Sequence, residues 1–225
     1  VFSVQDVVTL SGQEASSVRV GLHRWVDTGR IERLRRGLYT LNDRDREAPL
    51  TPAYLASAMV EPSYLSGVWM LSQLSVIPEA VFSVTAATRG RKLQFENAYG
   101  RFTYRRLPER AWFGYSSQEV QGYRFLQADS EKALLDAIYW SGSIWDSKRF
   151  QQERVDAGRL NGRRFQRYAK KWGAVKLKQS VEQFKVYKEA GSELVPVRVP
   201  SPVFLLKAIL ANLASINQKG SSELL

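Results

Sequence analysis

One stretch near the N-terminus decides the fold of the first part of the chain: ASSVRVGLHRWVDTGRIERLRRGLYT, residues 15–40. The apolar residues of its first half recur at the spacing of one helical face: Val18, Leu22, Trp25 and Val26. We therefore expect a helix from Ala15 to Thr28 with this stripe in the core, ended by Gly29. The second half predicts a β-hairpin whose tip is Arg35-Arg36-Gly37.

A shorter helix over Asp6–Leu10, ending at Ser11-Gly12, precedes this stretch. A short helix, a turn, a longer helix and a basic hairpin are the order of a winged helix-turn-helix, which we expect over residues 1–46. The DNA major groove accepts a helix with a small and polar outward face, and a wing tip lies beside the backbone. The expected DNA-binding residues are Ser16, Ser17, Arg19, Val20, His23, Arg24, Arg33, Arg35 and Arg36.

Other interpretations of this unit stay open. Winged-helix domains also mediate protein contacts alone, and an Arg-Arg-Gly turn can simply be solvated. His23 is the one histidine of the sequence, so it offers neither a metal site nor a catalytic triad, and we expect it at the surface or at a DNA edge. Trp25 is expected in the core rather than as a stacking platform.

Composition limits the class of protein. The 225 residues hold 33 Lys and Arg against 22 Asp and Glu, a net charge of +11, which favours a polyanionic partner such as DNA, RNA or a membrane surface. The absence of cysteine excludes disulfides, thiolate catalysis and cysteine-bound zinc. The first residues do not resemble a secretion signal, and the apolar stretch Val203–Ile216 is too short and polar to span a bilayer. We expect a cytoplasmic protein without a membrane partner.

A polar stretch at residues 42–49 predicts a linker to a second domain, residues 50–225, of mixed α/β structure with antiparallel hairpins and basic helices. The fold class is therefore α+β. The elements expected in its first half are a helix from Pro52, a helix capped by Ser63 that stops near Pro78, and a strand over Val81–Thr85. One hairpin is expected around Asn97–Gly100 and another between Trp112–Tyr115 and Tyr123–Leu126.

Helices dominate the rest of the second domain. Asp129 or Ser130 caps a helix through Tyr139, and a strand over Leu194–Val199 and a helix from about Val203 end the chain. Most of the excess positive charge lies between Lys148 and Lys188, where Asn161 can cap an amphipathic helix. Its basic face is a candidate second surface that follows phosphates, or else a solvated helix face: Arg163, Arg164, Arg167, Lys170 and Lys171. Its aromatic residues are expected in the core.

The sequence lacks the phosphate-binding glycine loops, the nucleophile elbow and the metal-ligand clusters that mark common enzymes. Glu131 and Asp136 could be imagined in a metal-dependent nuclease, but five positions on a helix place them about 140° apart. We therefore expect no enzyme, no catalytic residue, no metal and no cofactor.

Three segments of the chain carry a resemblance to a known family. The first is Leu22–Tyr39. The second opens with Glu61-Pro62-Ser63-Tyr64-Leu65-Ser66 and continues through Ile77-Pro78-Glu79 to Thr85–Thr88, and the third is Ala128–Asp136. In this order they resemble the AbiEi family, the antitoxins and transcriptional regulators of abortive-infection type IV toxin–antitoxin systems. In the third segment Ser130 stands where the family usually has proline, and serine can also begin a helix.

The resemblance, which covers about residues 1–141, implies a winged helix joined to a larger α/β domain. It implies binding to inverted repeats of double-stranded DNA in a promoter, with negative autoregulation of a two-gene operon active in phage defence. It also implies functional opposition to a nucleotidyltransferase-like toxin without a stable complex. Two alternatives remain: an RNA- or toxin-binding module that uses the basic C-terminal half, and a DNA-targeted metal-dependent nuclease.

Overall fold

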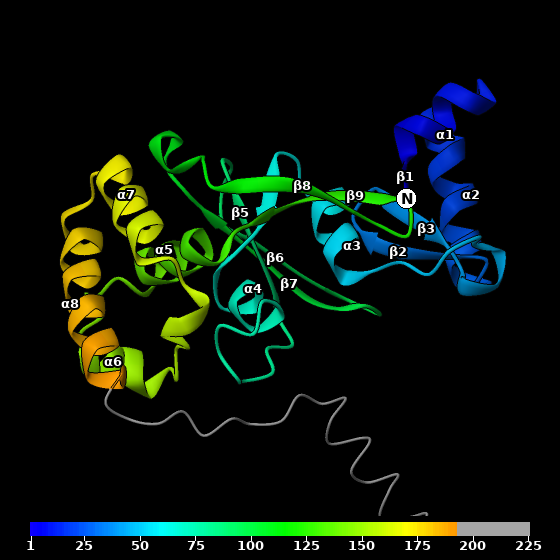
Figure 1. Cartoon of the computed structure of the whole chain (residues 1–225). Coiled ribbons are helices and arrows are strands. Elements are labelled where there is room, and N and C mark those ends of the chain that lie inside the picture. The colour runs from blue at the N-terminus through cyan, green and yellow to red at the C-terminus, as the bar shows by residue number, and fades with distance from the viewer. Residues whose placement is uncertain (193–225) are drawn as a thin grey trace, which may run out of the picture. The chain divides into compact units, whose positions relative to one another are not determined.

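The computed structural model describes residues 1–192, and it is a mixed α+β structure. The first part holds β1 (Phe2–Ser3), α1 (Val4–Ser11), α2 (Ala15–Asp27), β2 (Ile31–Arg35) and β3 (Leu38–Leu41) (Figure 1). The three strands form one antiparallel sheet in the order β1-β3-β2. The two helices and the hairpin thus lie where the sequence predicts them.

Local chemistry sets the ends of these helices. The Ser3 hydroxyl accepts a hydrogen bond from the Asp6 amide at 3.2 Å, and the Asp6 carboxylate accepts one from the Ser3 amide at 2.6 Å. These two bonds satisfy amides that a helix N-terminus leaves free, and they lower the pKa of Asp6. Gly12 ends α1 in the left-handed region, with φ of 65°.

The N-terminal elements enclose a small core of Val18, Leu22 and Ile31. Val26 packs against this core, but Trp25 is 46% exposed. The prediction that Trp25 is a core residue is therefore wrong, because the buried stripe of α2 ends on Val26 at the last turn of the helix.

A six-stranded mixed sheet organises the larger part, in the order β6-β7-β5-β4-β9-β8. The pairs β4–β9 and β5–β7 are parallel and the others are antiparallel. The strands are β4 (Ser63–Leu65), β5 (Val84–Thr88), β6 (Leu93–Asn97), β7 (Gly100–Arg106), β8 (Tyr115–Val120) and β9 (Tyr123–Ala128).

Helices cover both faces of this sheet. The Tyr104 hydroxyl donates to the Ala56 carbonyl of α3 at 2.7 Å, and the Tyr64 hydroxyl donates to Asp136 of α5 at 2.9 Å. Ala86 of β5 pairs with Leu65 of β4 on one side and with Tyr104 of β7 on the other, so Leu65 and Tyr104 point to the same face of the sheet. Tyr64 precedes Leu65 in β4 and therefore points to the opposite face. The helices are α3 (Pro52–Met59), α4 (Gly67–Gln73), α5 (Ser130–Ser141), α6 (Ser147–Gln152), α7 (Gly162–Trp172) and α8 (Val175–Ser192).

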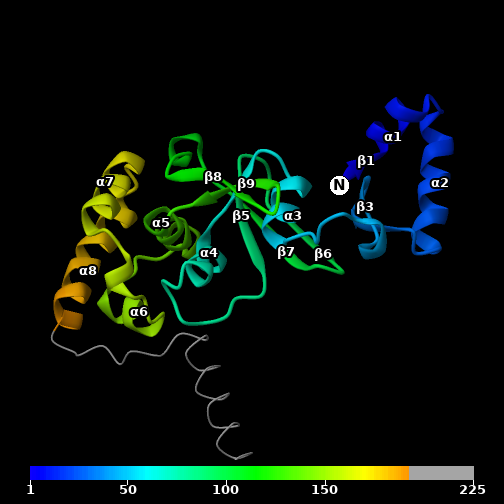
Figure 2. The same ribbon diagram turned by 45° about the vertical axis from the view of Figure 1, so that its right-hand side comes forward.

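α5 contacts β9, α4 and α7, and both views draw it between the sheet and α7 (Figures 1 and 2). Three short 3-10 helices connect other elements: η1 (Asp43–Asp45), η2 (Glu109–Ala111) and η3 (Ala157–Arg159).

Some expected elements shift or change type. Ser63 does not cap a helix, because it begins β4 in the middle of the sheet, and Ser66 is the N-cap residue of α4. The expected strand Val81–Thr85 begins later, as β5. In the second hairpin, the strand expected from Tyr123 lies there as β9, whereas its partner β8 begins at Tyr115 instead of Trp112. Gln121 and Gly122 of the turn both have positive φ, a conformation that suits two-residue hairpins. The expected strand at 194–199 and the helix from 203 lie outside the described residues.

Residues 1–189 form one compact unit. The large core includes Leu34 and Leu38 of the N-terminal hairpin together with residues of the sheet and of α5 and α7. The stretch predicted as a linker is also held in place, since Asn42 caps η1 and the Ala48 carbonyl accepts a hydrogen bond from Tyr123. The division into domains of residues 1–46 and 50–225 stays a prediction.

A buried ion pair lies at the centre of the larger part. Lys132 and Asp136, one turn apart on α5, pair with 0% side-chain exposure. The Tyr64 and Ser66 hydroxyls also donate to Asp136. Burial lowers the pKa of Lys132 and raises that of Asp136, while the attraction between the two charges opposes both shifts.

We expect Lys132→Met to lower the free energy of unfolding by about 3–5 kcal/mol, because Asp136 would remain as an uncompensated buried charge. Urea denaturation followed by circular dichroism measures the change. The double variant Lys132→Met/Asp136→Asn removes the lone charge and should recover at least about half of the loss. A single variant that loses less than about 1 kcal/mol would contradict the ion pair.

Candidate nucleic-acid interface

The outward face of α2 presents its polar and basic side chains to solvent. Its exposed residues include all six of the expected helix contacts: Ser16, Ser17, Arg19, Val20, His23 and Arg24. The core residues Val18 and Leu22 fix the rotation of the helix, so that these side chains point away from the sheet. Four of these six residues line a shallow depression of about 390 Å³ at the centre of the face: Arg19, Val20, His23 and Arg24.

His23 is held on this face by a neighbour on the next turn. Its Nδ1 lies 2.7 Å from Asp27 Oδ2, and both side chains are mostly exposed. The contact engages Nδ1, so Nε2 is the ring nitrogen that His23 can offer to a partner.

The hairpin supplies fewer outward arginines than the sequence predicts. Arg33 and Arg36 are exposed, but Arg35 is partly buried, and its Nε donates to the Met59 carbonyl of α3 at 2.6 Å. A shift of register between Arg33 and Arg35 marks a β-bulge, which breaks the alternation of side chains along β2. The expected placement of Arg35 at an exposed wing tip is therefore corrected.

The candidate second basic surface lies on α7. Phe165, Ala169 and Trp172 are buried, so the prediction of an apolar inner face is confirmed. Arg163, Arg167, Lys170 and Lys171 are exposed. Arg164 differs, because it is half-buried and its Nη1 lies 3.4 Å from Glu131 and 3.8 Å from Asp129.

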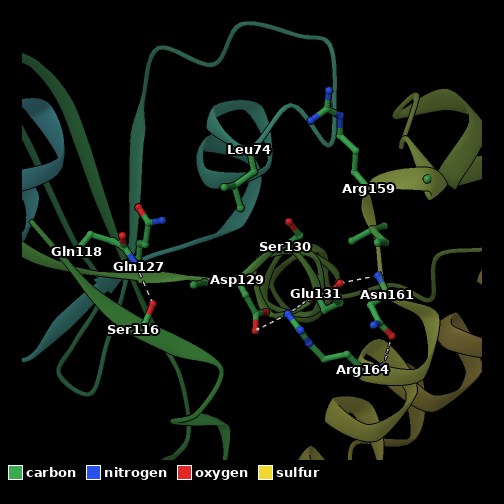
Figure 3. A pocket seen from close by; sticks show the side chains of 13 residues that line it. Leu74, Ser116, Gln118, Gln127, Asp129, Ser130, Glu131, Arg159, Asn161 and Arg164 are labelled. Atoms are coloured by element: carbon green, nitrogen blue, oxygen red, sulfur yellow. Dashed lines mark hydrogen bonds and ion pairs between the residues drawn. The ribbon is translucent and has the colours of Figure 1, made fainter. Parts of the chain in front are cut away.

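The carboxylates of α5 that a nuclease would need are bound in separate networks. Glu131, 3% exposed, accepts a hydrogen bond from the Asn161 amide at 2.6 Å and faces Arg164, as Figure 3 shows. Asp136 pairs with Lys132 instead. Within residues 1–192, no group of three or more acidic or histidine side chains is placed to hold a metal ion.

A polar pocket of about 670 Å³ opens beside Glu131, between the β8–β9 hairpin and the start of α7 (Figure 3). Asp129, at its edge, caps α5 and accepts a hydrogen bond from the Tyr168 hydroxyl at 2.8 Å. Burial and this contact raise the pKa of Tyr168 to about 12. The acidic groups of the pocket thus hold the helices together.

None of the helices in the described part of the chain is long and apolar enough to cross a membrane.

Sequence reasoning missed the contacts that seat the hairpin on the larger part. Asn97 Nδ2 donates to the Leu34 carbonyl at 3.1 Å, and Arg46 donates to the Tyr99 hydroxyl, which also faces Glu32. The sequence carries no periodic signal for these pairs, because their partners lie tens of residues apart.

We expect Glu131→Ala to lower the free energy of unfolding by about 1–3 kcal/mol, because it leaves the Asn161 amide without its acceptor. The matched control is Glu119→Ala, which removes an exposed ion pair with Arg124 and should change stability by less than about 0.5 kcal/mol. Thermal and urea unfolding measure both variants. Equal effects of the two variants would contradict the structural role of Glu131.

Comparison with known proteins bears on the N-terminal part. Residues 1–42 match the family model described as "Transcriptional regulator, AbiEi antitoxin". No curated protein is significantly similar to the chain. The match ends just after β3, so the resemblance over residues 61–136 stays a prediction. The matched segment, residues 1–42, spans α1, α2 and the hairpin. Through this segment the chain matches the AbiEi family of antitoxin transcriptional regulators, which confirms the resemblance predicted from the sequence there.

Proposed function

We propose that this protein is a transcriptional repressor that binds specific sites on double-stranded DNA through a winged helix-turn-helix. One observation carries the proposal: the exposed basic and polar face of α2 lies within the segment that matches a family of transcriptional regulators. α1 and α2 are the helices of the motif, and β2–β3 is the wing.

The side chains of α2 divide by their reach. Arg19 and Arg24 are long enough to hydrogen-bond guanine edges in the major groove, whereas Ser16 and Ser17, near the start of the helix, suit phosphate or base contacts. Val20, 53% exposed between them, suits contact with a thymine methyl group. A single exposed apolar residue is ordinary on a protein surface, so Val20 supports the proposal only through its place among the basic and polar residues of this face.

The wing contributes phosphate contacts from Arg33 and Arg36. Phosphate contacts give affinity and register but carry no sequence information. In this proposal, α2 determines which DNA sequence is preferred, and the hairpin contributes affinity that depends on salt concentration.

The family points to the biological setting of this repressor. An antitoxin regulator that represses its own operon binds inverted repeats, which require two copies of the chain on one site. The further proposal is that it opposes a nucleotidyltransferase-like toxin without forming a stable complex with it. We propose no catalytic activity, since Glu131 and Asp136 are engaged in structural networks.

A second candidate function rests on α7. Its four exposed cations could bind RNA or an acidic protein partner: Arg163, Arg167, Lys170 and Lys171. Deleting residues 1–46 is a poor test of this alternative, because the deletion would strip Leu34 and Leu38 from the large core. Charge substitutions on α2 or on α7 leave that core intact and compare the two surfaces fairly.

The experiment measures binding to a duplex from the promoter upstream of the gene and to a scrambled duplex of the same composition. The wild-type chain should prefer the promoter duplex by about 10³-fold or more. Arg19→Ala and Arg24→Ala should each weaken promoter binding by about 1–3 kcal/mol and reduce that preference, since each removes a base contact. Fluorescence anisotropy at fixed salt gives both affinities.

Two comparisons control this prediction. Arg124→Ala removes an exposed arginine of β9 and should leave promoter binding unchanged. A quadruple alanine variant of the exposed α7 cations separates the alternatives: if it abolishes binding while the α2 variants do not, α7 is the main surface. Equal affinity of the wild-type chain for the two duplexes would refute sequence-specific binding.

A further inference from the structure

The side chain of Arg35 leaves the hairpin and reaches the larger part of the molecule. Its Nε donates to the Met59 carbonyl at 2.6 Å, and its Nη1 donates to the Arg36 carbonyl at 3.2 Å. Met59 is the last residue of α3, where backbone carbonyls lack partners within the helix. The last turn of α3 has no basic residue of its own, so Arg35 brings a cation to this helix end from a distant strand.

The residues around Arg35 are seated on the same side. Leu34 is 2% exposed and Leu38 is 8% exposed, and both belong to the large core. The Leu34 carbonyl accepts the hydrogen bond from Asn97, the last residue of β6. The base of the hairpin tip is therefore attached to α3 on one side and to β6 on the other.

Arg33 and Arg36, the arginines on either side of Arg35, are exposed to solvent and do not face α3. The β-bulge between Arg33 and Arg35 turns Leu34 into the core and Arg35 toward α3, while Arg33 and Arg36 remain exposed. Two adjacent arginines, Arg35 and Arg36, thus have different environments although the sequence makes them look alike.

We propose that Arg35 is a positioning residue of the DNA-binding surface and not a DNA contact: by holding the Met59 carbonyl, it fixes the hairpin on the larger part, so that the exposed arginines meet the backbone in one orientation. This inference rests on the proposed DNA-binding function. A wing fixed in this way loses little conformational entropy on binding, and it sets the orientation of the larger part on the DNA.

Salt dependence separates a positioning role from a phosphate contact. Each phosphate contact contributes about 0.9 to the slope of log K against log salt. Arg36→Ala should therefore lower the slope by about one, whereas Arg35→Ala should weaken binding about tenfold at every salt concentration and leave the slope unchanged. Promoter-duplex titrations between about 50 and 200 mM salt measure both.

A glutamine substitution sharpens the test. Arg35 uses its Nε for the bond to Met59, and the Nε2 of glutamine lies the same number of bonds from the backbone. Arg35→Gln can therefore keep this hydrogen bond while it removes the charge. Positioning predicts near wild-type affinity and slope for Arg35→Gln. A phosphate contact predicts that Arg35→Gln and Arg35→Ala both lower the slope by about one, and that result would overturn the proposal.

Amide hydrogen exchange on the free full-length chain tests the attachment without DNA. Arg35→Ala should speed exchange in the hairpin, residues 31–41, and at the end of α3 by about tenfold or more, while Arg35→Gln and Arg36→Ala should match the wild type. Unchanged exchange in Arg35→Ala would refute the attachment. If the variants differ from the wild type in this way but the wild-type chain does not bind the duplex, the proposed function fails and the attachment stands.

Discussion

The arrangement of the larger part depends on an ion pair that has no access to water. Lys132 and Asp136 face each other across one turn of α5, and the Asp136 carboxylate also receives hydroxyl groups from Tyr64 and Ser66 at the middle of the sheet. Removing two charges from water is costly, and such a pair is tolerated only where its geometry is complete. The hydrogen bonds from Tyr64 and Ser66 to Asp136 therefore join α5 to β4 and to the residue that follows it.

Lys132 also contacts α7, through the ring of Trp172. Its ammonium lies 4.4 Å from the centre of the Trp172 ring and 5.3 Å from that of Phe113. Gly114, with φ of 71°, allows the chain to pass close to α5 and α7, because a Cβ there would lie 2.9 Å from the Tyr168 ring and 3.0 Å from Lys132 Cβ. The lysine thus joins the sheet, α5 and α7 around one buried cation, and the Glu131–Asn161 bond fixes α7 on the same helix.

How much the sequence predicts depends on whether a residue's partner is local. Helix ends are local, and the caps at Gly12, Asp129 and Asn161 all lie as expected. The expected helix cap at Ser63 is wrong because its partner is not local: Ser63 pairs with Thr88 of β5, and this register makes it a strand residue. On the candidate site, periodicity predicts that the polar and basic face of α2 is exposed, since Val18 and Leu22 fix the helix rotation, but it also places Trp25 wrongly in the core. The orientation of Arg35 depends on a bulge and on Met59, which no pattern in the hairpin encodes.

Charge counted along a sequence therefore overstates the charge available to a polyanion. Arg164 looks like part of the basic face of α7, yet its guanidinium faces Glu131 and Asp129. Arg35 looks like a wing-tip contact, yet it caps α3. In both cases the fold takes one arginine from a basic cluster and uses it to attach that cluster to the larger core. The arginines that remain exposed are thereby held on a rigid support. In the DNA complex proposed above, a rigid support lowers the conformational entropy that these arginines lose when they contact phosphates.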